Sequence, residues 1–397
     1  MKNYNSRNSI LFMLLAFVFN SCTETYPLLT NTFEEDLVVE ATITNELKTQ
    51  EIKISKTSKF ENTTTTAETG AVVYITDNAS NRYNFAEQSG TYISESEFQA
   101  VPGREYRLNI KTSNGKSYQS TVETMSPINP INDLNIAVET KDTITGVSIK
   151  VNSYDPKNSS KYYRFEYEET YKIITPHWSF NTAVVIPAKN AESNPQINLI
   201  PNSLNTRICY GSKKSTDIIL TTTAELAEDR LNFPIRFISN KNYIISYRYS
   251  ILVRQYIENL AAYSFYETLN KMSGSESVLS PKQPGFLNGN LKSVSNPNEK
   301  VIGFFDVASV SSKRVYFNYL DLFPGQAIPP YYIKCPVESV LFCFGLPLCN
   351  GNALATALEN HSMTYSHQDG ITYYIYPAPC GDCTTFASNI KPLFWEE

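Results

Sequence analysis

The stretch Glu105-Tyr106-Arg107-Leu108-Asn109-Ile110-Lys111, with Asn114-Gly115 soon after it, decides the fold class of this chain. Its apolar side chains alternate with charged and amide side chains, which is the period of a strand with one buried face. Asn-Gly is a strong signal for a type I′ hairpin turn, because both residues tolerate a positive φ. The stretch therefore predicts a half-buried strand that ends in a tight antiparallel hairpin.

Short strand patterns of the same kind lie on both sides of this stretch, at residues 37–44, 50–56, 71–77, 81–85, 91–94 and 116–123. Closely spaced strands with no helical periodicity between them are typical of a β-sandwich. We therefore expect an Ig-like or transthyretin-like sandwich over residues 36–126. The two prolines of Ser126-Pro127-Ile128-Asn129-Pro130 favour an extended link after it.

The rest of the chain, residues 131–397, predicts a larger, fibronectin-III-like β-sandwich with short helical insertions. Strand patterns occupy residues 134–140, 145–153, 161–174, 243–257, 301–307 and 313–319. Residues 176–205 have little pattern and are interpreted as a long loop. Thr222-x-x-Glu225 resembles a capping box, so a short helix is expected before Pro234. The helical spacing of Ala262, Phe265, Leu269 and Met272 predicts a second helix, and residues 353–360 a third.

The N-terminus has the features of an export signal. Lys2 and Arg7 precede an apolar run over residues 10–19. As a helix this run is about 15 Å long, too short for a hydrocarbon core of about 30 Å. Phe19-Asn20-Ser21-Cys22 resembles a lipoprotein processing site, which implies a signal peptide over 1–21, acylation of Cys22 and a lipidated tether over 22–35. The alternative is an ordinary secretory signal in which Cys22 has no role.

Six further cysteines favour disulfides, because a chain exported from the cytosol meets an oxidising compartment. They are Cys209, Cys335, Cys343, Cys349, Cys380 and Cys383. Most lie near the C-terminus, so we expect a disulfide-stapled C-terminal region, with the pairing left open. Cys380-Gly381-Asp382-Cys383 also has the spacing of a redox pair, but the surrounding prolines and glycine predict a loop rather than a helix start. Zinc ligation by these cysteines is the remaining alternative.

Composition excludes several classes of protein. Hydrophobic residues make up 42% of the 397 residues, too many for a disordered chain, and the net charge of −5 argues against nucleic acid as a partner. No Gly-x-Ser-x-Gly elbow or glycine-rich phosphate loop occurs, and His361 and His367 are not spaced as helical metal ligands. Glu166, Glu168 and Glu169 are typical of a solvated strand, and Asp155-Pro156-Lys157-Asn158 of a plain turn. We therefore expect no enzyme, no metal and no cofactor.

Of all the features of the sequence, the aromatic side chains come closest to indicating a binding surface. Tyr and Trp offer rigid contact area with a polar end, which suits sugars, peptides and proteins. The candidate contact residues for a partner are His177, Trp178, Tyr331 and Tyr332, which lie beside the patternless segment or after a pair of prolines. The alternative is that most of the aromatic residues line the two β-cores.

The order of several motifs resembles the DUF4249 family of Bacteroidetes outer-membrane lipoproteins. These motifs are the lipoprotein cysteine, Phe33-Glu34-Glu35-Asp36-Leu37-Val38-Val39-Glu40-Ala41, Lys161-Tyr162-Tyr163-Arg164-Phe165-Glu166-Tyr167-Glu168-Glu169, Arg207-Ile208-Cys209-Tyr210, Gln283-Pro284-Gly285-Phe286-Leu287-Asn288-Gly289-Asn290, Val301-Ile302-Gly303-Phe304-Phe305, Cys380-Gly381-Asp382-Cys383 and Lys391-Pro392-Leu393-Phe394-Trp395. The resemblance implies a lipid-anchored protein of the outer membrane, exposed at the cell surface.

The resemblance names a domain of unknown function, so it implies no mechanism. Such lipoproteins are commonly encoded beside TonB-dependent receptors, and the expected partner is therefore a TonB-dependent outer-membrane barrel. The leading hypothesis is a non-enzymatic accessory or binding subunit of such a transporter. The alternatives are a structural or assembly component of a larger envelope complex, in protein secretion or outer-membrane biogenesis, and a surface hydrolase.

Overall fold

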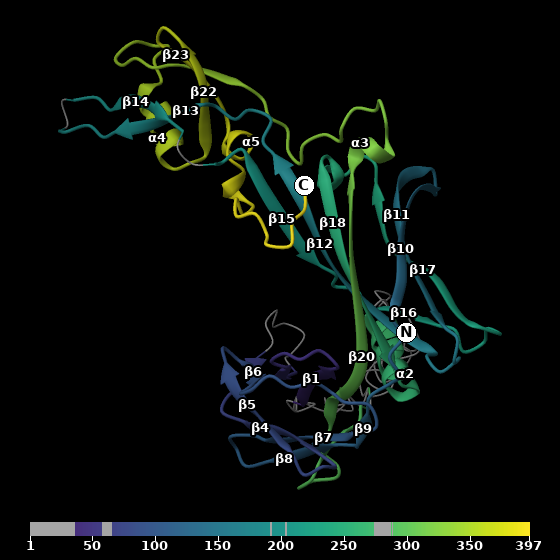
Figure 1. The fold of residues 1–397 in the computed structure, drawn as a ribbon. Helices are drawn as coiled ribbons and strands as arrows, with labels where there is room; N and C mark the ends of the chain where they lie inside the picture. Colours follow the sequence, from purple (N-terminus) through teal and green to yellow (C-terminus); the bar gives the residue numbers. More distant parts are fainter. Residues whose placement is uncertain (1–35, 58–65, 191–192, 203–204, 274–286, 288) are drawn as a thin grey trace, which may run out of the picture.

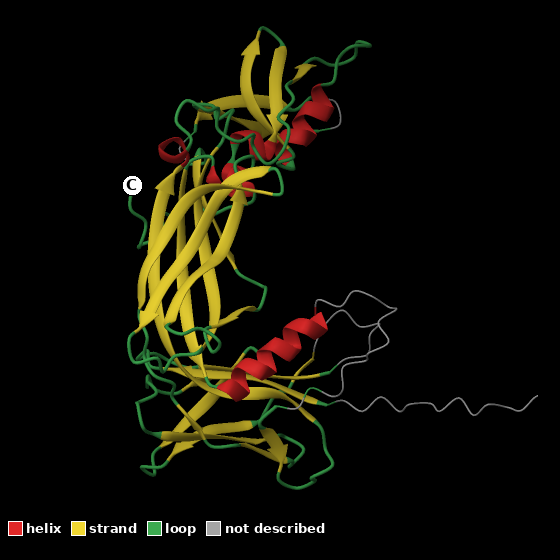
Figure 2. Cartoon of the chain, turned by 90° about the vertical axis from the view of Figure 1, so that its right-hand side faces the viewer, coloured by secondary structure: helices red, strands yellow, loops and turns green. Residues whose placement is uncertain are grey.

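A computed structural model describes residues 36–57, 66–190, 193–202, 205–273, 287 and 289–397 of the chain. Strands account for 50% of it and helices for 11%, which confirms a mainly β fold. The molecule is elongated, with the strands nearest the N-terminus at one end and a small group of C-terminal strands at the other (Figures 1 and 2). No helix within the described residues is long and apolar enough to cross a membrane.

The N-terminal lobe, residues 36–124, consists of short antiparallel strands around one apolar core. Its strands are β1 (Leu37–Thr44), β2 (Glu51–Lys56), β3 (Thr66–Ala67), β4 (Val72–Asp77), β5 (Arg82–Gln88), β6 (Thr91–Ser94), β7 (Glu105–Lys111), β8 (Ser117–Ser120) and β9 (Glu123–Thr124). The alternation predicted for β7 is confirmed, because Tyr106, Leu108 and Ile110 are all buried. The predicted type I′ turn at Asn114-Gly115 is wrong. Of these two residues only Gly115 has a positive φ, and its N–H donates to the Thr112 carbonyl, as in a three-residue hairpin loop.

The middle lobe has two sheets that pack on a shared core. One sheet contains β10 (Ile131–Lys141), β11 (Ile144–Asp155) and β17 (Asp229–Ser239). The other contains β15 (Ile208–Lys214), β16 (Ile219–Thr222), β12 (Tyr162–Ile174), β18 (Arg248–Glu258) and β20 (Val301–Asn318). Buried side chains from both sheets, among them Val147, Ile149, Phe165 and Ile251, form one apolar cluster. This is a sandwich-like arrangement, and the Ig-like and fibronectin-III-like assignments stay predictions.

Strand β20 joins the two lobes. Its first half pairs in parallel with β1, from Leu37↔Val301 to Thr44↔Ala308, and its second half pairs antiparallel with β18, from Ile257↔Ser309 to Arg248↔Asn318. The prediction of two separate strands here was wrong. Ser309 and Ser311 lie between the two predicted strands, but both belong to the continuous strand. They also bond the segment that connects the two lobes. The Ser309 hydroxyl donates to the Pro127 carbonyl, and the Ser311 hydroxyl accepts from the Ile131 N–H at the start of β10.

The distal lobe, residues 181–201 and 338–381, has a small core of its own. It contains the hairpin β13 (Asn181–Ile186) and β14 (Gln196–Pro201), the sheet β21 (Glu338–Leu341), β23 (Thr372–Pro377) and β22 (Met363–Asp369), and helices α4 (Gly351–Glu359) and α5 (Ala378–Gly381). Residues 176–205 are therefore not simply a loop. Ala183, Val185, Ile197 and Leu199 alternate inward and pack on the cluster around Leu354 and Leu358.

The remaining elements correct or confirm the helix predictions. The helix expected after Thr222 is absent: Thr223 and its neighbours form turns, and Pro234 lies in β17, beside an irregularity in the pairing with β11. The N-terminal end of the strand expected at 243 is instead the 3₁₀ turn η1 (Tyr243–Ile245). Helix α2 (Leu260–Ser273) and α4 confirm the other two helices, while α3 (Tyr319–Leu322), β19 (Leu291–Ser293) and η2 (Cys383–Thr385) complete the order.

Candidate functional site

The six cysteines form three disulfides, as the sequence predicted in general terms. The pairs are Cys209–Cys383, Cys335–Cys380 and Cys343–Cys349. Cys380 and Cys383 therefore bond to different, distant cysteines and not to each other, which contradicts the redox-pair alternative. All six sulfurs are held in S–S bonds, which also contradicts the zinc alternative. The expected loop around Cys380 is instead the short helix α5.

The four aromatic candidates lie around α5, at the base of the distal lobe. The His177 N–H donates to the Cys380 carbonyl at 2.9 Å, and the Tyr331 hydroxyl donates to the Pro379 carbonyl at 2.8 Å. The His177 ring stacks on Tyr376 with the centroids 3.8 Å apart. The fold thus brings these sequence-distant residues to one joint, where they attach the distal lobe to the rest of the chain.

Most of the contact area of these side chains is used within the chain. The Trp178 indole N–H donates to Thr206 Oγ1 at 3.1 Å, and the Tyr332 ring lies 4.4 Å from that of Phe386. All four candidates are half-buried. By contrast Phe180, which stands edge-to-face against Trp178, is 80% exposed. His177, Trp178, Tyr331 and Tyr332 therefore pack against other parts of the chain, and their role as contacts for a partner stays a prediction.

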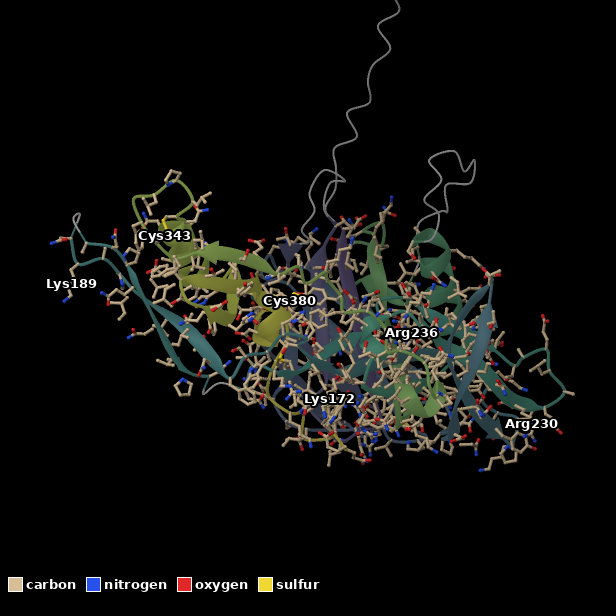
Figure 3. All side chains as sticks on the ribbon, turned by 90° about the horizontal axis from the view of Figure 1, so that it is seen from above. Lys172, Lys189, Arg230, Arg236, Cys343 and Cys380 are labelled. Atoms are coloured by element: carbon tan, nitrogen blue, oxygen red, sulfur yellow. A yellow bond between two sulfur atoms is a disulfide. The ribbon has the colours of Figure 1, made fainter. Side chains whose placement is uncertain are left out.

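A second candidate surface is the loop from Cys343 to Cys349, which we call the apolar loop. Its sequence is Cys343-Phe344-Gly345-Leu346-Pro347-Leu348-Cys349, and the disulfide closes it at its base. Leu346 is 68% exposed and Leu348 77% exposed. In Figure 3, Cys343 lies on the same side of the molecule as Lys189, and Arg230 lies on the opposite side. The loop therefore presents two large apolar side chains to solvent in the distal lobe.

The base of the apolar loop is held by short-range contacts. The Gly351 N–H bonds the Cys343 carbonyl at 3.2 Å, and the Cys349 N–H bonds the Leu346 carbonyl at 3.0 Å. A Cβ atom at Gly351 would lie 2.5 Å from the Phe344 ring, so only glycine lets that ring close on the start of α4. Gly345, in the loop itself, has a φ of +78°. The disulfide and the hydrogen bonds hold the loop in shape, and Gly345 in the loop and Gly351 in α4 permit that shape.

A third candidate is a cavity of about 730 Å³ between the N-terminal lobe and the middle lobe. Its walls come from β1, β2, β12, α2 and the start of β20. Arg164 is the most buried of the charged side chains in its wall, at 7% exposed. Its Nε donates to Glu258 at 2.7 Å and its Nη1 to Glu166 at 2.5 Å, while the Tyr256 and Tyr266 ring centroids lie 4.2 Å and 4.7 Å from its Cζ.

These contacts keep Arg164 charged. Burial opposes its positive charge, but Tyr266, Glu258 and Glu166 raise the pKa of Arg164 well above its ordinary value. Burial also raises the pKa of Tyr256 to about 12, helped by Glu166. Because the guanidinium is already paired with two carboxylates and covered by two rings, it is committed to the fold rather than offered to a ligand.

Asp306 lies near Arg164 and Glu258 and is 1% exposed. Among the described residues, neither of its carboxyl oxygens has a hydrogen-bond partner when the carboxyl group is ionised, and Glu258 Oε2 has none either. Burial, and then repulsion and hydrogen bonding by Glu258, raise the pKa of Asp306 well above its usual range. A proton on one Asp306 oxygen makes that oxygen a donor toward Glu258, which gives a partner to one oxygen on each side chain.

Several other polar residues singled out in the sequence have partners within the chain. Glu169 accepts from Arg236 and from the Tyr249 hydroxyl, at 2.7 Å for the latter. Asp155 accepts from the backbone N–H groups of Lys157, Ser159 and Ser160 and from the Ser159 hydroxyl, so the tetrapeptide that begins there is a turn. His367 stacks on Tyr374. Among the described residues, no group of three His, Cys, Asp or Glu side chains has a metal-binding arrangement.

A protein-family model matches most of the chain. The model of DUF4249, described as a domain of unknown function, matches residues 23–314. The chain belongs to the DUF4249 family. In this DUF4249 chain the match covers the N-terminal and middle lobes and ends within β20. The apolar loop and most of the distal lobe lie beyond it. No curated protein matches the chain.

Two expectations fall on residues outside the described ranges. They are the signal peptide over 1–21 and Cys22 with its tether over 22–35. Four residues of these sites are not singled out by the sequence patterns: Leu346, Leu348, Arg164 and Asp306. For the two leucines a signal was present: residues 339–358 contain no Asp, Glu, Lys or Arg in a chain that is 18% charged. No local signal distinguishes Arg164 or Asp306, because their environment depends on strands distant in sequence.

Proposed function

We propose that this protein is a lipid-anchored outer-membrane lipoprotein that works by contact, as a non-enzymatic accessory or binding subunit of a TonB-dependent transporter. The observation that carries the proposal is the placement of the apolar loop relative to the start of the described chain. Residue 36 enters β1 in the N-terminal lobe, while the apolar loop lies in the distal lobe at the opposite end (Figures 1 and 2).

The continuous strand β20 sets how far the distal end of the molecule lies from the start of β1. Its 18 residues, at about 3.3 Å per residue, span about 56 Å from the residue opposite Leu37 to Asn318. The interlobe contacts support it: the Val310 N–H donates to Asn45 Oδ1 at 2.6 Å, and the Asn259 amide donates to Glu123 at 2.9 Å. In a protein attached through Cys22, the N-terminal and middle lobes would hold the distal lobe at a fixed distance from the first strand.

The charge pattern agrees with a contact surface rather than a chemical site. Interface cores are depleted in charged residues, and large apolar side chains exposed together mark sites of association. The distal lobe exposes Leu346, Leu348 and Phe180. In the cavity between the lobes, Arg164 is instead paired with Glu258 and Glu166.

The test is isolation of the affinity-tagged protein from outer membranes dissolved in a mild detergent. We expect one integral barrel to co-purify in a fixed ratio, and identification of it as a TonB-dependent receptor would support the proposal. The matched control is Cys22→Ala, which should leave the membrane fraction and lose the barrel. An acyl-free Cys22 by mass spectrometry, or recovery without any barrel, would contradict the proposal. A barrel devoted to secretion or membrane-protein insertion would instead favour an assembly component.

A further inference from the structure

The cavity between the N-terminal and middle lobes has the size of a small-molecule site. Its volume of about 730 Å³ lies within the range of ligand pockets, about 300–1,000 Å³. Strand β1 supplies one wall because its side chains alternate: Val39 and Ala41 enter the core of the N-terminal lobe, whereas Val38 and Glu40 are on the opposite face of the strand. Helix α2, which lies over the strands of this lobe, supplies another wall (Figure 2).

Contacts between the elements hold these walls in place without a ligand. Glu40 of β1 pairs in register with Phe304 of β20. The ring of Phe265, on α2, packs on Phe304 with the centroids 5.5 Å apart, and the Tyr266 ring covers the guanidinium of Arg164 on β12. The cavity is therefore formed in advance by both lobes, as is usual for sites that bind small molecules.

One part of the cavity wall is apolar. Leu269 and Phe265 from α2, Ile302 from β20, and Leu287 belong to a single apolar cluster, and all four line the cavity. Val38 adds to this surface from β1, where its register partner is Ile302. An apolar or aromatic body placed here would remove this surface from water.

The basic groups in the rest of the wall are already paired. The charged side chains that line the cavity are Glu40, Glu51, Lys53, Arg164, Glu166 and Asp217. Lys53 lies 3.9 Å from Glu51, and Arg164 binds Glu166 as well as Glu258 behind it. Neither base is therefore free to attract an anion.

Glu40 and Asp217 remain after this pairing. Both side chains are exposed, and among the residues that the structure describes neither forms an ion pair. Two uncompensated carboxylates beside a low-dielectric wall produce a negative potential, and a concave surface focuses it. The cavity thus combines an apolar surface with a local excess of negative charge.

We infer that this cavity binds an organic cation with an apolar body. The positive group is attracted by Glu40 and Asp217, and the body covers Leu269 and Ile302. An anion would meet two unpaired carboxylates, and a neutral apolar molecule would take water from them without giving a partner in return. This binding function goes beyond the proposed function, because it requires no barrel, and Arg164 takes no part in it.

The experiment compares two fluorescent probes on the full-length protein, in the same detergent for every variant. Berberine is a planar quaternary cation, and anilinonaphthalene sulfonate is an apolar anion; both become brighter in an apolar site. We expect saturable binding of berberine with a Kd on the order of 10 μM, and binding of the anion about tenfold weaker or less.

Charge-neutral variants test the role of the two carboxylates. Glu40→Gln and Asp217→Asn should each weaken berberine binding about threefold, and together about tenfold, because each removes one attractive charge. The matched control is Glu97→Gln, since Glu97 is also an exposed acid of the N-terminal lobe but does not line the cavity. Berberine should bind this control as it binds the wild type.

A charge-reversing variant locates the site. Val38→Lys should weaken berberine binding about tenfold and strengthen binding of the anion, because it places a cation in the apolar wall. Val138→Lys is the control, on an exposed position of β10. Loss of both probes in Val38→Lys would show a distorted cavity, and the decision would then rest on the two charge-neutral variants.

The outcomes are independent of the proposed function. Absence of saturable berberine binding, equal affinity for the cation and the anion, or unchanged affinity in the double variant Glu40→Gln/Asp217→Asn would each overturn the inference. Failure to recover a barrel would overturn the proposed function alone.

Discussion

Two buried aspartates show how one type of side chain takes opposite roles in this fold. Asp155 is 7% exposed, and hydrogen bonds from Ser159, Lys157 and Ser160 outweigh its burial and lower its pKa to about 2. Asp306 is 1% exposed and faces Glu258, and burial with that repulsion raises its pKa well above 3.8. The first carboxylate therefore stabilises the fold in its charged form, and the second in its protonated form.

Asp155→Ala should lower the free energy of unfolding at pH 7 by about 2 kcal/mol, the equivalent of a pKa that falls from 3.8 to about 2. Because the folded pKa lies below the unfolded one, this stabilisation is complete above pH 4 and is lost as the pH falls through 2. Urea unfolding at several pH values would measure it. Asp133→Ala is the control, since that side chain is 62% exposed. A difference that does not shrink below pH 4 would contradict the assignment.

Asp306→Asn should raise the free energy of unfolding at pH 7.5, on the order of 1 kcal/mol. The native protein holds a proton on Asp306 that the unfolded chain releases above its ordinary pKa of 3.8, so stability falls as the pH rises from there toward the raised folded pKa. The variant needs no such proton, and its advantage should grow with pH. Glu258→Gln should instead destabilise the fold, because it removes the carboxylate paired with buried Arg164. Thermal melts across pH would distinguish these slopes.

Among the elements, β20 depends on a glycine where it pairs with β1. Gly303 has a φ of +137°, and a Cβ atom there would lie 2.0 Å from the Val39 carbonyl oxygen. The neighbouring Gly289 is packed against the Gly303 carbonyl, where a Cβ would have no room. Only glycine permits both the backbone angle and the close approach of the chains, so the parallel pairing of β1 with β20 requires it.

Gly303→Ala should therefore lower the free energy of unfolding by about 3 kcal/mol or more, through both strain and the clash with β1. Gly325→Ala is the matched control. Gly325 also has a positive φ, +73°, but its Cβ direction is open. It should cost only about 1 kcal/mol, from strain alone. Chemical denaturation measures both, and equal losses would show that the contact with Val39 is unimportant.

The local pattern predicted most of the strands and failed where neighbours in space decide the structure. The alternation in β7 and the helical spacing in α2 were sufficient, because each has one buried face. Thr222 and Glu225 satisfied a capping pattern, yet the segment forms turns before β17 pairs with β11. The hairpin of β13 and β14 was missed because its inward residues contact α4, far along the chain. The apolar loop was missed although the uncharged stretch over residues 339–358 marks it in the sequence, because that stretch does not show which of its leucines are exposed.

At the scale of the whole molecule, the disulfides differ in what they restrain. Cys209–Cys383 joins residues 174 positions apart and ties β15 to the C-terminal segment, whereas Cys343–Cys349 spans 6 positions. Loop-closure entropy predicts that removing them as Cys→Ser pairs costs about 5 and about 2 kcal/mol respectively. Denaturant unfolding of the two double variants tests this order. A larger loss for Cys343–Cys349 would mean that strain or residual structure, and not loop length, sets their contributions.

Because β20 pairs with β1 in one half and with β18 in the other, the N-terminal and middle lobes should lose structure together. The distal lobe has its own sheet and core and its own disulfide. In Gly303→Ala, we therefore expect faster hydrogen exchange in β1 and also in β18, whose residues do not touch the substituted site. Exchange in β22 and β23 should stay at the wild-type rate, which makes these strands the internal control. Faster exchange confined to β1 would mean that the two lobes unfold independently, and that β20 does not couple the expected anchored end to the middle of the molecule.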